Sequence, residues 1–251
     1  MRRALALLLF APIMLGQAKP QLVPDVSHSQ IEIRYSFTGA KLLLFGAILY
    51  PGGRIPTEDA DIAVVVKGPT ERIVVREKQQ VAGIWMNVES ARFRSAPSFY
   101  AVASSQPLSK IIDERTAAIY ELGLGNLQLS PGSGKPADVQ QRFERGLVEM
   151  KRMHGLYFED PDGVEIRQGV LYRAEIDIPA RVPVGEYTAE TFLVRNGRVV
   201  SGEVREIQIE KLGFERFVAM AAERWSLAYG LVAVLVSVLL GWAGSLVMRR
   251  R

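Results

Sequence analysis

The stretch IEIRYSFTGAKLLLFGAILYPGG, residues 31–53, carries two strand patterns in succession. From Ile31 to Phe37 apolar side chains occupy every second position, the period expected of a strand with one buried face. The second part, Lys41–Tyr50, is an almost continuous apolar run that ends at Pro51-Gly52-Gly53, as expected of a strand covered on both faces. The stretch therefore predicts that this part of the chain folds as β-sheet.

More short strand patterns follow, with turn residues between them. A turn is predicted at Gly68-Pro69, and the pattern of short strands favours a sandwich over a parallel α/β sheet. The predicted strands are Asp61–Lys67, Arg72–Arg76, Ile84–Val88 and Phe99–Ala103.

Helical periodicity interrupts the strand patterns over about residues 109–155. Ser109 can cap a helix over Lys110–Leu122. A second helix is predicted over Ala137–His154, and Gly155 suits the position just after its end. Its apolar stripe consists of Val139, Phe143, Leu147 and Met150. We expect the two helices to form a helical hairpin inserted into the β domain.

Strand patterns return over 164–178, 185–195 and 199–210. Asn196-Gly197, between the last two, is a strong hairpin signal. Gly185 and Tyr187, at the start of a strand, match the G-x-Y corner of immunoglobulin-like sandwiches. Residues 19–211 are therefore predicted to be mainly β, an immunoglobulin-like β-sandwich with a helical-hairpin insertion. The alternative is two small β domains separated by the helices.

The two ends carry membrane signals. Arg2 and Arg3 precede a short apolar stretch and the small residues Gly16 and Ala18, so residues 1–18 are predicted to be a cleaved signal peptide. Leu227–Met248 contains no charge and as a helix would be about 33 Å long, enough to cross a bilayer. We expect a transmembrane helix there, a juxtamembrane helix over 212–226 and a cytoplasmic basic tail over 249–251.

This arrangement predicts a single-pass protein of the inner (cytoplasmic) membrane with its N-terminal domain in the periplasm. The expected membrane helix has a small residue at every fourth position, which would let another helix approach closely. This ridge comprises Ala233, Ser237, Gly241 and Ser245.

Composition argues against several classes of function. Five of the 31 basic residues lie at the chain ends, which leaves 26 against 27 acidic residues, so we expect no nucleic-acid partner. The chain has no cysteine and two histidines, His28 and His154, and it lacks the common catalytic motifs. We therefore expect no enzyme activity, no catalytic residues, no cofactor and no metal site.

Residues 83–108, GIWMNVESARFRSAPSFYAVASSQPL, are the most distinctive part of the predicted β domain. Aromatic and arginine side chains together suit a recognition surface, although they equally suit a sandwich core with edge loops. The candidate interaction residues are Trp85, Asn87, Arg92, Phe93, Arg94, Phe99 and Tyr100.

The whole layout resembles the alphaproteobacterial "putative transmembrane protein" family, exported proteins with one C-terminal membrane helix. The resemblance rests on VSHSQIEIRYSFTGAKLLLFGA (Val26–Ala47) and on the G-I-W-x-N and P-S-F-Y segments within 83–108. It implies no catalytic residues. It implies a neighbouring permease of the sulfite-exporter type as a partner.

These observations lead to the hypothesis of a membrane-anchored periplasmic binding or interaction module, an accessory subunit of an inner-membrane partner such as that permease. A homo-oligomer is the other partner arrangement we consider. Two alternative functions remain open: a periplasmic enzyme acting on envelope material, for which His28 or His154 would have to meet carboxylates in a cleft, and a structural envelope protein.

Overall fold

The computed structural model describes residues 19–33, 39–56, 60–132, 134–211, 218 and 222–248. The predicted signal peptide, most of the juxtamembrane segment and the basic tail lie outside these residues. The strands are β1 (Gln21–Val26), β2 (Gln30–Ile33), β3 (Gly39–Leu49), β4 (Asp61–Lys67), β5 (Thr70–Val81), β6 (Ile84–Pro97), β7 (Tyr100–Ser104), β8 (Ser130–Pro131), β9 (Tyr157–Asp160), β10 (Val164–Arg167), β11 (Leu171–Pro179), β12 (Gly185–Arg195) and β13 (Arg198–Lys211). The helices are α1 (Leu108–Ile111), α2 (Glu114–Ile119), α3 (Ala137–Met153) and α5 (Ser226–Met248), with 3-10 turns at Pro51–Gly53 and Leu124–Asn126.

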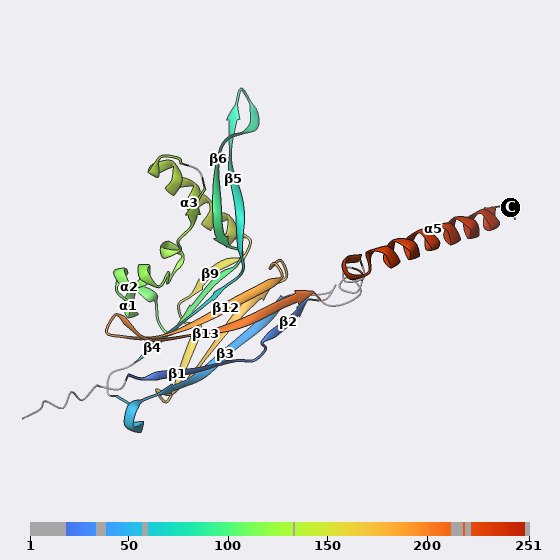
Figure 1. Ribbon diagram of the computed structural model, residues 1–251. Coiled ribbons are helices and arrows are strands. Elements are labelled where there is room, and N and C mark those ends of the chain that lie inside the picture. The colour runs from blue at the N-terminus through green and yellow to red at the C-terminus, as the bar shows by residue number, and fades with distance from the viewer. Residues whose placement is uncertain are drawn as a thin grey trace, which may run out of the picture.

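Two sheets pack face to face as a β-sandwich (Figure 1). One sheet has the strand order β1-β3-β11-β10 and the other β2-β13-β12-β4-β7-β9. Their inward side chains form one core, in which Leu44 and Ile176 from the first sheet join Val64 and Leu193 from the second. The prediction of a mainly β chain is correct, and the alternation of buried and exposed residues along β11 shows the reason: every second side chain enters this core.

Strands from before and after the helices share both sheets. β3 pairs with β11 over nine residue pairs, from Leu171↔Ala47 to Pro179↔Gly39, and β4 pairs with β12. The chain therefore forms one sandwich here, and the alternative of two small β domains is wrong.

The helices do not form the expected helical hairpin. The predicted helix over Lys110–Leu122 divides into α1 and α2, because Ile112 is extended (φ −136°) and the Asp113 carboxylate caps α2 by accepting from Thr116 N at 2.6 Å. α1 and α2 contribute Ile111 and Ala117 to a second core on the outer face of the six-stranded sheet. α3 belongs to a different core, with β5 and β6.

Two local expectations are confirmed. Asn196 and Gly197 both have positive φ, +48° and +77°, and connect β12 to β13. Tyr187 is buried at the start of β12, and its hydroxyl donates to the Pro183 carbonyl at 2.7 Å, the bond that defines a tyrosine corner.

The expectation of a C-terminal transmembrane helix is wrong. α5 is helical, but among the residues that the structure describes no helix is both long enough and apolar enough to cross a membrane.

Candidate interaction surface

A two-stranded ribbon leaves the sandwich and continues as a projecting hairpin, β5–β6 (Figure 1). β4 pairs with β7, and the pairing continues across the junction, where Gly68 N donates to Phe99 O at 2.8 Å and Ser98 N to Pro69 O at 2.9 Å. The turn predicted at Gly68-Pro69 is therefore absent: the chain runs on from one sheet into the next. This continuity sets the direction of the hairpin.

Close packing at the junction requires glycine at position 68. A Cβ added to Gly68 would lie 2.6 Å from Ser98 Oγ and 2.9 Å from a ring carbon of Tyr187. Both distances are shorter than real Cβ contacts, and the buried Tyr187 ring is held by its corner hydrogen bond. The root of the hairpin is thus packed directly on the tyrosine corner.

α3 braces the lower half of the hairpin. Its buried Phe143 and Leu147 pack against Phe93 and Ala91 of β6. Lys151, two turns beyond Phe143 on the same face, is also buried; its ammonium group pairs with the Glu71 carboxylate at 2.5 Å and lies 3.4 Å from the Ser98 carbonyl. An apolar stripe and one buried cation therefore hold α3 against the base of the hairpin.

A second ionic contact lies higher on the hairpin. Glu77 of β5 stands directly opposite Glu89 of β6, an unfavourable pair of like charges. Arg142 of α3 forms ion pairs with both, at 3.2 Å to Glu77 and closer to Glu89. This arginine offsets the repulsion between the two carboxylates and balances one of their two negative charges.

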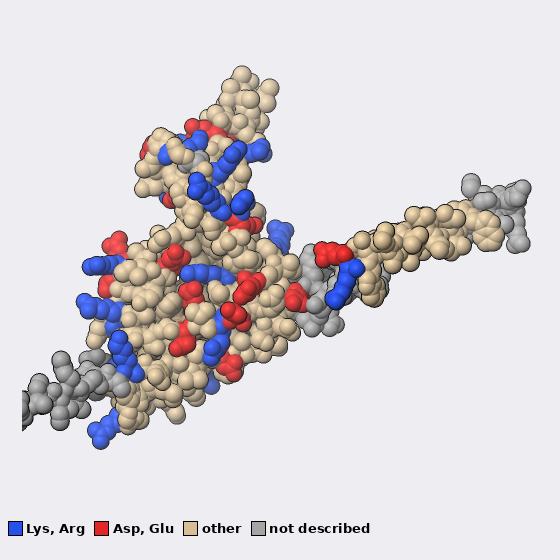
Figure 2. Space-filling view, in the orientation of Figure 1, with Lys and Arg blue, Asp and Glu red and all other residues tan. Residues whose placement is uncertain are grey.

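The end of the hairpin carries no charge. Residues 79–88 contain no ionisable side chain, and Ala82 and Gly83 make the reversal with positive φ (+50° and +85°). Ile84 and Trp85 are 69% and 66% exposed, and Val81, Met86 and Val88 are also exposed. Figure 2 shows this end as an uncharged projection with charged side chains gathered below it. We call residues 79–88 the hairpin tip.

The seven residues predicted as an interaction surface do not form one surface. Trp85 and Asn87 lie exposed at the hairpin tip, and Arg92 and Arg94 are exposed lower on β6. The three remaining aromatic residues are buried: Phe93 under α3, Phe99 in the sandwich core and Tyr100 beneath α1 and α2. The alternative interpretation of this segment, as core with edge loops, fits the burial of those three residues, and only Trp85 and Asn87 belong to the tip.

Sequence reasoning missed most of the tip. Ile84 and Met86 fell within the predicted strand Ile84–Val88, Val81 lay outside every predicted strand, and the reversal at Ala82-Gly83 was not recognised. The signal was present, since an uncharged run of ten residues with a central glycine lies between the charged residues Lys78 and Glu89.

The histidines stand on different elements. His28 is exposed in the turn between β1 and β2, where its Nδ1 lies 3.0 Å from Ser27 Oγ. His154 is the exposed C-cap of α3. Among the described residues, no three histidine or carboxylate side chains gather as a metal site would require.

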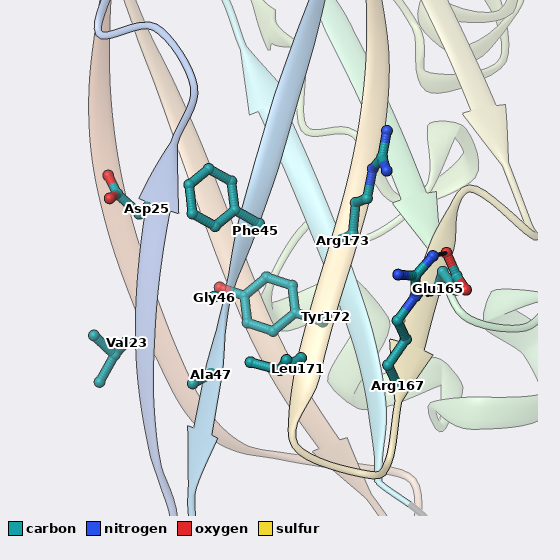
Figure 3. Close-up of a pocket in the computed structure, with 10 residues that line it drawn as sticks. All are labelled: Val23, Asp25, Phe45, Gly46, Ala47, Glu165, Arg167, Leu171, Tyr172 and Arg173. Carbon is teal, nitrogen blue, oxygen red and sulfur yellow. Dashed lines mark hydrogen bonds and ion pairs between the residues drawn. The ribbon is translucent and has the colours of Figure 1, made fainter.

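A shallow pocket of about 410 Å³ lies on the outer face of the four-stranded sheet (Figure 3). Val23, Phe45 and Leu171 form its apolar part. The ion pair between Arg167 and Glu165 borders it, with Arg167 Nε 2.9 Å from a carboxylate oxygen. This pairing lowers the pKa of Glu165, through the hydrogen bond from Arg167 first, so the carboxylate stays ionised and suits a structural rather than a proton-transfer role.

Tyrosines with strongly shifted titration are structural here. Burial raises the pKa of Tyr100, whose hydroxyl donates to the Glu121 carbonyl at 2.5 Å and accepts from Gly123 N at 3.1 Å. Burial likewise raises the pKa of Tyr157, whose hydroxyl donates to the Pro97 carbonyl. Both hydroxyls bind backbone and stay protonated, so neither supplies a nucleophile or a base.

The ridge on α5 is exposed in the part that the structure describes. Ala233 and Gly241 are exposed, nothing lies within 4 Å of a Cβ added to Gly241, and Ser237 Oγ donates back to the Ala233 carbonyl at 2.8 Å. The side chain of Ser245 lies outside the described set. Helix packing through this ridge remains a prediction.

These features define a class of protein: a β-sandwich that presents a braced hairpin with an uncharged, apolar tip. The model of the family described as "Putative transmembrane protein (Alph_Pro_TM)" matches residues 21–250, and the chain belongs to this family. The match confirms the resemblance drawn from the sequence. The family's description connects the chain with a membrane.

Other comparisons add little. No curated protein matches the chain. Among solved structures, the chain is similar to the crystal structure of Spo0M, a sporulation control protein from Bacillus subtilis, with 10% sequence identity and a TM-score of 0.29. The match covers 83% of this chain and 56% of the Spo0M chain, so this chain spans little more than half of the length of Spo0M. A TM-score this low does not indicate a shared fold.

Proposed function

We propose that this protein is a binding and interaction module on the periplasmic side of the inner membrane, and that the hairpin tip is its contact element. The exposure of the tip carries the proposal. Monomeric proteins rarely display contiguous apolar side chains at the end of a projecting element, and such patches mark interaction sites. Here Ile84 and Trp85 are about two-thirds exposed.

The brace supports the same proposal. A hairpin fixed by Lys151 and Arg142 loses less conformational freedom when its tip binds than a free hairpin would. We further propose that the protein acts as an accessory subunit of an inner-membrane partner, the sulfite-exporter-type permease implied by the resemblance being the first candidate.

Photocrosslinking in native membranes tests the proposal. A benzoyl-phenylalanine is placed at Trp85, and the matched control is placed at Leu49, which is 51% exposed on the sandwich. We expect an adduct from position 85 and none from position 49. Equal labelling at both positions, or none at either, contradicts the assignment of the tip as contact element. A permease among the adducts would support the accessory-subunit role.

A further inference from the structure

The hairpin tip exposes apolar side chains on both faces of a two-stranded ribbon. Val81 pairs with Ile84 and Gln80 pairs with Trp85. Because successive residues in a strand point to opposite faces, Val81, Ile84 and Met86 share one face and Trp85 lies on the other. A protein groove would cover one face of the ribbon, whereas an apolar medium contacts both.

The polar residues of the tip are all neutral amides. Gln79, Gln80 and Asn87 are exposed but uncharged, so burying the tip among lipid headgroups desolvates no ionised group. Trp85 is the residue type that favours the membrane–water interface, because it joins a large apolar ring to one hydrogen-bond donor.

Below the tip the exposed charge of the hairpin is basic. Of its three carboxylates, Glu71 pairs with Lys151 of α3, and Glu77 and Glu89 share Arg142. The exposed basic side chains of the two strands outnumber them. These are Arg72, Arg76, Lys78, Arg92 and Arg94. An apolar tip followed by basic side chains is complementary to an anionic bilayer. The apolar side chains can enter the interface, and the basic side chains near the membrane surface attract the anionic lipids.

We infer that the hairpin tip inserts into the headgroup region of an anionic lipid bilayer. This inference rests on the proposed function and names the partner of the same site. Ile84 and Trp85 enter the interface, and Lys78 and Arg76 stand at the level of the lipid phosphates. The brace by α3 keeps the charged part of the hairpin outside the apolar layer.

Tryptophan fluorescence tests this on the full chain. The protein has three tryptophans, Trp85, Trp225 and Trp242, so the variant W225F/W242F reports on the tip alone. It is mixed with vesicles of phosphatidylcholine and phosphatidylglycerol that contain lipids brominated near the headgroup. We expect a blue shift and quenching of Trp85, with weaker quenching in vesicles of phosphatidylcholine only.

Matched variants separate tip insertion from membrane attachment elsewhere in the chain. Ile84→Asp in the same background should lower the quenching about tenfold, since it places a charge in the interface. Leu49→Asp, at an exposed position of the sandwich, should leave quenching unchanged. Neither side chain is buried. Unfolding midpoints equal to that of the parent protein would confirm that both variants fold.

The results also separate the two proposals. If the brominated lipids do not quench Trp85 but position 85 forms a protein adduct in native membranes, the lipid inference is wrong. The proposed interaction module is then still supported. Unquenched Trp85 without any adduct overturns both. Quenching that Ile84→Asp does not reduce also overturns the inference, because the signal would then come from attachment elsewhere.

Discussion

The ion pair between Lys151 and Glu71 makes an asymmetric prediction about stability. The Lys151 side chain is 8% exposed, whereas that of Glu71 is 40% exposed. Glu71→Gln leaves a buried ammonium group without its counter-charge. Lys151→Met leaves a carboxylate that water already reaches and fills the space of the lysine stem with apolar atoms. The glutamate variant should therefore be the more destabilised of the two.

The magnitudes follow from burial. Breaking a fully buried pair costs about 3–5 kcal/mol, and the partial exposure of Glu71 reduces this to about 2–3 kcal/mol for Glu71→Gln. Lys151 also contacts the Ser98 carbonyl at 3.4 Å, so Lys151→Met loses that weak contact as well and should cost about 1 kcal/mol. The double variant should be close to Lys151→Met alone, because no charge is then left buried.

Urea unfolding of the full chain measures these differences. Far-ultraviolet circular dichroism follows the transition in a mild non-ionic detergent, which accommodates the exposed apolar side chains of α5. Hydrogen exchange in α3 and β5 then locates the loss of protection. A Lys151→Met variant that is destabilised as much as Glu71→Gln refutes the reasoning, since desolvation of the ammonium group would not control the pair.

Four further outcomes are expected. Gly68→Ala should destabilise the protein by about 1–3 kcal/mol in urea unfolding, because its methyl group overlaps the Tyr187 ring and Ser98; an unchanged midpoint would show that the junction can relax. Burial raises the pKa of Tyr187 to about 12. Its contribution to stability is therefore complete below pH about 10, where the unfolded tyrosine is also neutral, and is lost as the pH rises towards 12; Tyr187→Phe should flatten that alkaline loss in pH-dependent unfolding. Ala82→Asn should stabilise the hairpin by about 0.5–1 kcal/mol, since asparagine tolerates positive φ better than alanine, and slower amide exchange at the tip would show it. Arg142→Ala should cost about 0.5–1 kcal/mol, less at high salt, because these ion pairs are half exposed.

Local signals in the sequence were sufficient for most individual elements. Short apolar runs located β3 and β4, period-two alternation located β11, and the Asn196-Gly197 pair located the β12–β13 hairpin, since all of these signals depend on residues close together in the chain. The apolar stripe of α3 was correct at Phe143 and Leu147, which are buried. Tyr187 was recognised as a corner residue from its spacing to Gly185.

The arrangement of these elements depended on contacts between distant residues. Gly68-Pro69 has the composition of a turn, but hydrogen bonds to Phe99 and Ser98, some thirty residues later, keep the chain extended there. The same cause explains the candidate surface: Trp85 and Phe93 are both aromatic residues of one strand, and only the position of α3 decides that Phe93 is covered and Trp85 is not.

Membership of the family and the mainly β character were thus determined by the sequence alone, because residue types and their short-range periodicity carry that information. Which strands pair across the helical segment, and where the hairpin projects, were decided only by the tertiary structure. Pairings such as β3 with β11 form between residues more than 120 positions apart, and their free energy comes from a shared core that no local pattern describes.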